Sequence, residues 1–167
     1  MKEALVQNIG TTFSELEKTV SSFPEEQVNV IPFENSWTAG QVAEHIIKAL
    51  GGAARTLNGK TETTDREPGE KVKAINDMFL DFTTKMKSPD FILPGNETHT
   101  KSELLPAIGK LKEEILGLTN LDLSVLCLGF ELPGFGKFTR LEWIHFFLAH
   151  TQRHTHQLKN IYSILNK

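Results

Sequence analysis

The segment 138–165 constrains the fold most, because a helix start signal is followed there by a long helical pattern. Thr139 and Glu142 fit a capping box, and Phe138 with Trp143 fits the hydrophobic staple that sets how a chain enters a helix. Beyond this start, apolar residues recur at spacings of three and four in two adjacent stripes. The pattern predicts one long helix that turns two faces inward, and such a helix needs other helices around it.

The same start signal occurs earlier in the chain. Thr38 and Gln41 fit a capping box, so a second helix is expected to begin at Thr38 and to end before Asn58-Gly59. Apolar spacing predicts three further helices, the last of them with Ser102 as its N-cap: Leu5 to Val20, Glu70 to Met86 and Leu104 to Leu118.

The connecting segments are expected to be loops, at 58–69, 89–101 and 120–137, because turn-forming residues cluster there or no clean period appears. No segment shows the alternation of a half-buried strand. The predicted class is therefore all-α, a four-helix bundle with one additional helix and long loops, in a single domain over 1–167.

Composition excludes several classes of protein. The 167 residues are 39% hydrophobic, enough for one domain with a real core, and the net charge of -3 with scattered basic residues disfavours a nucleic-acid binder. Cys127 is the one cysteine, the N-terminus lacks the apolar core of a signal peptide, and no apolar run could span a bilayer. We expect a cytoplasmic protein with neither nucleic acid nor membrane as partner. A homodimer is left open, since bundles with exposed apolar faces often pair.

Two of the six histidines, His150 and His154, have the spacing of a metal-ligand pair on the last helix. Residues four apart share a helix face, with side chains roughly 5 to 6 Å apart. His45 is the best third ligand, because it lies mid-helix on the apolar side of the second helix. Three histidines from two helices would form the open site typical of catalytic zinc. The alternative is a pair of imidazoles satisfied by ordinary hydrogen bonds.

Two glutamines are placed to orient these candidate ligands. Gln41 precedes His45 by four residues, and Gln157 follows His154 by three. An imidazole ligand usually donates its second N–H to such a partner. Either glutamine could equally be a solvated helix residue. The remaining histidines lack ligand spacing, and His99 in a polar loop is expected to be exposed.

Other kinds of active site find little support. The segment 150–154 lacks the glutamate of a zincin protease, and neither a serine nucleophile elbow nor a phosphate loop occurs. Cys127 lies between two leucines and is interpreted as a small buried hydrophobic residue. Glu142 is explained by its capping role, so no side chain is assigned as a general base.

Three motifs together resemble those of the DinB/YfiT-like superfamily: Trp37-Thr-x-x-Gln-Val-x-x-His45, Pro133-Gly-x-Gly136-x-x-Thr139-Arg-x-Glu142-Trp143 and His150-x-x-x-His154-x-x-Gln157. They span nearly the whole chain. The resemblance implies a four-helix bundle and a divalent metal ion, zinc or nickel, held by histidines that match His45, His150 and His154.

The resemblance also implies a class of function. Members of the superfamily include S-transferases that use bacillithiol or mycothiol, a mycothiol-dependent maleylpyruvate isomerase, and proteins described as hydrolases. We therefore expect a metal-dependent enzyme that acts on a small molecule, by transfer of a low-molecular-weight thiol or by hydrolysis. A non-catalytic bundle that binds a ligand or metal is the alternative. The long segment 58–101 departs from the pattern and is expected to lie near the site.

Overall fold

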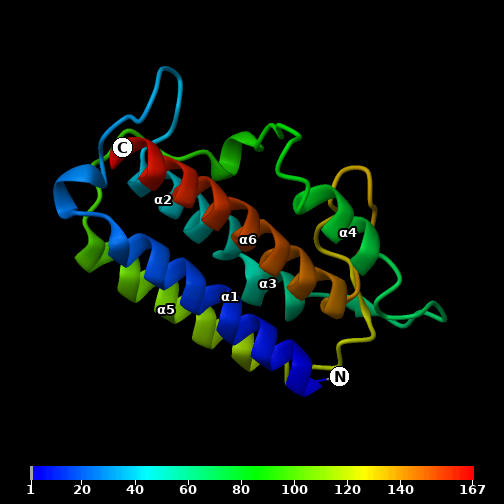
Figure 1. Ribbon diagram of the computed structural model, residues 1–167. Helices are drawn as coiled ribbons and strands as arrows, with labels where there is room; N and C mark the ends of the chain where they lie inside the picture. The colour runs from blue at the N-terminus through cyan, green and yellow to red at the C-terminus, as the bar shows by residue number, and fades with distance from the viewer. Residues whose placement is uncertain (1) are drawn as a thin grey trace.

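The computed structural model describes residues 2–167 and is built mainly of helices (Figure 1). Its elements, in chain order, are α1 (Lys2–Ser22), η1 (Glu25–Gln27), α2 (Ala39–Leu50), α3 (Ala53–Leu57), β1 (Thr61–Glu62), α4 (Val72–Phe79), η2 (Asp90–Ile92), α5 (Lys101–Leu118), β2 (Leu126–Cys127) and α6 (Arg140–Leu165). The predicted all-α bundle is confirmed. The first, fourth and last predicted helices correspond to α1, α5 and α6.

The bundle is organised around α6, which packs against α1, α2 and α4, while α5 packs against α1 and α2 (Figure 1). Apolar side chains fill the space between the helices, and six of the large ones with no exposed surface are Ile9, Phe13, Leu16, Ile46, Ile115 and Ile144. No helix within residues 2–167 is both long and apolar enough to cross a membrane.

Capping boxes start α2 and α6, as the sequence predicts. The Thr38 hydroxyl accepts from the Gln41 N–H at 3.1 Å, and the Gln41 side chain accepts from the Thr38 N–H at 3.0 Å. Thr139 and Glu142 repeat the arrangement at 3.1 and 2.8 Å. These bonds satisfy N–H groups that the first turn of a helix leaves without partners.

The structure corrects the extent of two predicted helices. The second ends at Leu50, and after Gly51-Gly52 only the short α3 follows. The third covers 72–79 instead of 70–86, because the Asp81 carboxylate binds the Thr83 N–H and hydroxyl at 3.0 and 2.5 Å. An aspartate that bonds to the backbone two residues later competes with the helix and forms a turn.

Two further expectations are wrong. The N-cap of α5 is Thr100 and not Ser102, because the Glu103 carboxylate accepts from the Thr100 N–H at 3.2 Å and from its hydroxyl at 2.9 Å. The loops also form an antiparallel pair of strands, β1 with β2. Strands of two residues are too short to show a period in sequence.

Candidate metal centre

Facing turns of α2 and α6 bring the three predicted histidines together. The Nε2 atom of His45 lies 3.1 Å from the Nε2 atoms of both His150 and His154. One ring nitrogen from each residue lies within 4.8 Å of the other two, and within residues 2–167 this is the group that could hold a metal ion. The pair four residues apart on α6 thus meets its third member across the bundle.

The three rings differ in their access to solvent. His45 is completely buried and His150 is 6% exposed, whereas His154 keeps partial exposure. Aromatic rings surround the inner two: Trp37 lies 5.1 Å from His45, and Phe146 lies 5.8 Å from His150 between ring centres. His154 is therefore the least buried of the three rings.

Hydrogen bonds at the other ring nitrogen fix two tautomers. The Nδ1–H of His45 donates to the Ile92 carbonyl at 2.8 Å, and the Nδ1–H of His154 donates to the Gln157 side-chain oxygen at 2.8 Å. A neutral imidazole has one donor and one acceptor, so Nε2 of both rings carries a lone pair. Nδ1 of His150 is buried and has no hydrogen-bond partner within the described residues.

The surroundings also keep the rings uncharged. Burial lowers the pKa of His150 well below its ordinary value, and the neighbouring histidines lower it further. Burial, with His45 nearby, lowers the pKa of His154 to about 4, and burial lowers the pKa of His45. Neutral imidazole is the form that binds metal, so at neutral pH the cluster is in the ligand state.

This donor set fits a divalent cation. His45 and His154 direct lone pairs at each other across 3.1 Å, and two acceptors cannot form a hydrogen bond. A cation between them would remove the repulsion. Nitrogens bound to a tetrahedral ion at 2.0 to 2.1 Å lie about 3.3 Å apart, close to the observed separation.

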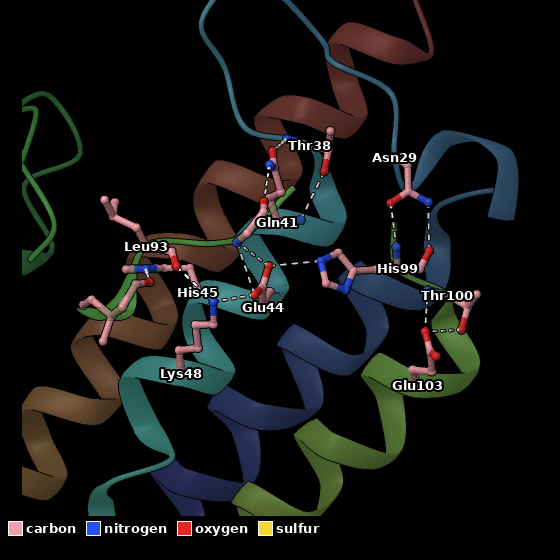
Figure 2. A network of polar contacts seen from close by, with 12 residues as sticks. Asn29, Thr38, Gln41, Glu44, His45, Lys48, Leu93, His99, Thr100 and Glu103 are labelled. Atoms are coloured by element: carbon pink, nitrogen blue, oxygen red, sulfur yellow. Dashed lines mark hydrogen bonds and ion pairs between the residues drawn. The ribbon is translucent and has the colours of Figure 1, made fainter. Parts of the chain in front are cut away.

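Gln157 occupies the orienting position that the sequence predicts, but Gln41 does not. The Gln41 amide donates to the Gly95 carbonyl at 2.8 Å, and its oxygen accepts from the Thr38 N–H (Figure 2). The partner of His45 is instead the main-chain carbonyl of Ile92. Every residue has a carbonyl, so no residue type in the sequence could have signalled this contact.

The other histidines have roles outside the cluster. The expectation that His99 is exposed is wrong: its side chain is only 15% exposed. Its Nε2–H donates to the Glu44 carboxylate on α2 at 3.1 Å. His156 stacks on Phe82 with ring centres 4.1 Å apart. His156 is thus a natural control for the two histidines that α6 contributes to the cluster.

The fold is thus a helical bundle, and between α2 and α6 it carries three histidines that could hold a metal ion. The family model of the DinB superfamily matches residues 9–158, and the chain belongs to this superfamily. No curated protein matches the sequence.

Among solved structures, the chain is similar to that described as "YfiT from Bacillus subtilis is a probable metal-dependent hydrolase with an unusual four-helix bundle topology". The TM-score is 0.64 with 15% sequence identity, over 99% of this chain and 87% of that chain. At this identity the likeness establishes a shared fold.

Proposed function

We propose that this protein is a metal-dependent enzyme in which His45, His150 and His154 hold one divalent ion. The observation that carries the proposal is the convergence of the three Nε2 atoms, two of them 3.1 Å from the third. Their low pKa values and the outward bonds of two Nδ1 atoms support the same role. Three imidazoles favour zinc or nickel over the hard cations magnesium and calcium.

The proposed reaction is hydrolysis, or the transfer of a low-molecular-weight thiol, with a small molecule as substrate. A divalent ion at this site would supply Lewis-acid activation of a water molecule or of a thiol. The description of YfiT as a probable metal-dependent hydrolase supports the first reaction. The resemblance to thiol-dependent transferases of the superfamily supports the second.

The chain's own residues would orient the ligands and limit water. Gln157 and the Ile92 carbonyl hold two rings with Nε2 toward the centre, and the aromatic wall around His45 and His150 excludes solvent. Glu142 is unsuited to act as a general base, because Arg66 and backbone N–H groups bind both of its oxygens. Substrate would approach from the partly exposed side of His154.

Metal content tests the first half of the proposal. Protein purified without a histidine tag should hold one equivalent of metal by elemental analysis, and His150→Ala should lose it. His156→Ala should retain it, because that ring stacks on Phe82 outside the cluster. Equal loss in the two variants would contradict the ligand assignment.

Turnover tests the second half. Metal-loaded protein is assayed for hydrolysis of ester and amide substrates, and for transfer of bacillithiol or mycothiol to electrophiles, with His150→Ala as the negative control. Metal-dependent turnover in either assay supports the enzyme. Stoichiometric metal without turnover in both would favour the non-catalytic, metal-binding bundle.

A further inference from the structure

One face of α2 binds the segment 92–99. Gln41, Glu44, His45 and Lys48 follow the spacing i, i+3, i+4, i+7, which places their side chains on one side of a helix. All four make polar contacts to this segment (Figure 2). His45, the candidate metal ligand on α2, is therefore one of four neighbouring side chains that bind the segment 92–99.

Three of these side chains donate to main-chain carbonyls that lie close together in sequence. Beside the His45 bond to Ile92, Lys48 Nζ donates to the Leu93 carbonyl at 3.0 Å, and the Gln41 amide donates to the Gly95 carbonyl at 2.8 Å. These bonds depend on where the backbone lies and not on side-chain identity. The segment must hold one position for all three to form.

Glu44 is the acceptor in the set. Its carboxylate binds the Gly95 N–H at 3.1 Å, the Lys48 ammonium at 2.6 Å and the His99 Nε2–H at 3.1 Å. The Glu44 side chain is 14% exposed. Charge-assisted bonds at a partly buried site are among the stronger ones in proteins. Glu44 thus joins the middle of the segment, at Gly95, to its end, at His99.

Close packing holds the His99 end against α2. A Cβ atom at Gly40 would lie 3.0 Å from two atoms of His99, so the ring fits here because residue 40 is glycine. The main chain of His99 is bound on its other side by the Asn29 amide, through two bonds of 2.8 Å. Substitution at Gly40 would displace His99 without touching the histidine cluster.

We propose that Glu44 is a positioning residue for the metal centre. Through Gly95 and His99 it holds the segment 92–99 where the Ile92 carbonyl accepts the Nδ1 proton of His45, which leaves Nε2 free as the ligand. The inference rests on the proposed metal site. It identifies the contacts that orient His45, the proposed ligand on α2. His154 differs, because its acceptor Gln157 lies on the same helix and needs no distant segment.

Metal affinity is the first test. Zn²⁺ affinity is measured by competition with a chromophoric chelator in wild-type protein, Glu44→Ala and Gly40→Ala. Loss of an orienting partner typically weakens metal binding about 10- to 100-fold, and both variants should fall in that range. Glu103→Ala is the matched control, since this carboxylate caps α5 beside the same segment without contacting α2. It should bind zinc within about twofold of wild type, well short of that range.

The imidazole tautomer is the second test and needs no metal. Nitrogen-15 NMR of the metal-free protein should show His45 with its proton on Nδ1, and Glu44→Ala should give a mixture of tautomers. His154 should be unchanged and serves as the internal reference. An unchanged His45 tautomer, together with wild-type zinc affinity in Glu44→Ala and Gly40→Ala, would overturn the inference. Failure of wild-type protein to bind zinc would instead refute the proposed metal site, and the tautomer would still test the role of Glu44.

Discussion

The carboxylate of Glu142 has no contact with water, and hydrogen-bond donors around it stabilise its charge. Its side chain is fully buried, and Arg66 binds it through two bonds of 2.6 and 2.7 Å. Backbone N–H groups of Lys71 and Thr139 complete its partners at 2.8 Å each. Burial by itself would raise the pKa of Glu142, but these bonds hold it below its ordinary value. One residue thereby caps α6 and fixes the segment before α4.

Glu142→Gln should destabilise the protein by about 3 kcal/mol. The substitution removes the negative charge of the pair and leaves the largely buried guanidinium of Arg66 without an opposite charge. Denaturant unfolding measures the difference. Glu15→Gln is the control, since Glu15 and Lys159 form an exposed pair at 2.6 Å that should contribute less than about 1 kcal/mol. Comparable losses in the two variants would contradict the role given to the buried pair.

The contribution of Glu142 should also depend on pH. A carboxylate whose pKa is lower in the folded than in the unfolded state stabilises the fold above its unfolded pKa, near 4.3, and loses this effect as pH falls through the folded pKa. The stability difference between wild type and Glu142→Gln should be constant from about pH 7 to 5 and shrink below about pH 4. Unfolding curves over this range test it. A difference that grows on acidification would reverse the assigned sign.

The sequence predicts where α2 and α6 begin, but it does not predict several of the contacts that their side chains make. A capping box lies within four consecutive residues, so the starts at Thr38 and Thr139 are visible in the sequence. The three histidines of the cluster can also be identified from the sequence, because helical spacing and the matched motifs both indicate them. The Ile92 carbonyl has no such signal, and the Arg66 to Glu142 pair joins residues 76 positions apart.

The proposed ion would join α2 to α6, so its removal should lower thermal stability. Protein carrying one equivalent of metal should lose about 5 to 10 °C in Tm on addition of a chelator, if free metal had been near 100 times Kd. The chelator should have little effect on His45→Ala, which has lost the link from α2. An equal shift in this variant would show that the ion does not connect the two helices.

At the scale of the molecule, the long segment between α3 and α5 runs beside the pair of helices that carry the histidines (Figure 1). Arg66 binds α6 near its start, α4 packs on α6, and Ile92 to His99 lie against α2. Between these points, Arg153 of α6 donates to the carbonyls of Phe79 and Asp81 at 3.2 and 2.8 Å, and to that of Thr84. The expectation that 58–101 lies near the site agrees with these contacts.

Arg153→Ala should free residues 80–86 without unfolding the bundle. Amide hydrogen exchange followed by mass spectrometry should show faster exchange in this stretch, because the guanidinium bonds that hold its carbonyls are gone. Exchange in α5 should be unchanged. Lys159→Ala, an exposed change on the same helix, should leave 80–86 as in wild type. Similar exchange in both variants would mean that other contacts hold this stretch.

The single imidazole of His45 connects two binding events, because one nitrogen points to the proposed ion and the other bonds to Ile92. Thermodynamic coupling is reciprocal: if an ordered 92–99 segment strengthens metal binding by some factor, bound metal must strengthen the attachment of the segment by the same factor. Metal binding would thus change the local stability of Gly95 and its neighbours at the surface of the protein. A metal ion bound between two buried helix faces would in this way determine how well ordered the segment 92–99 is.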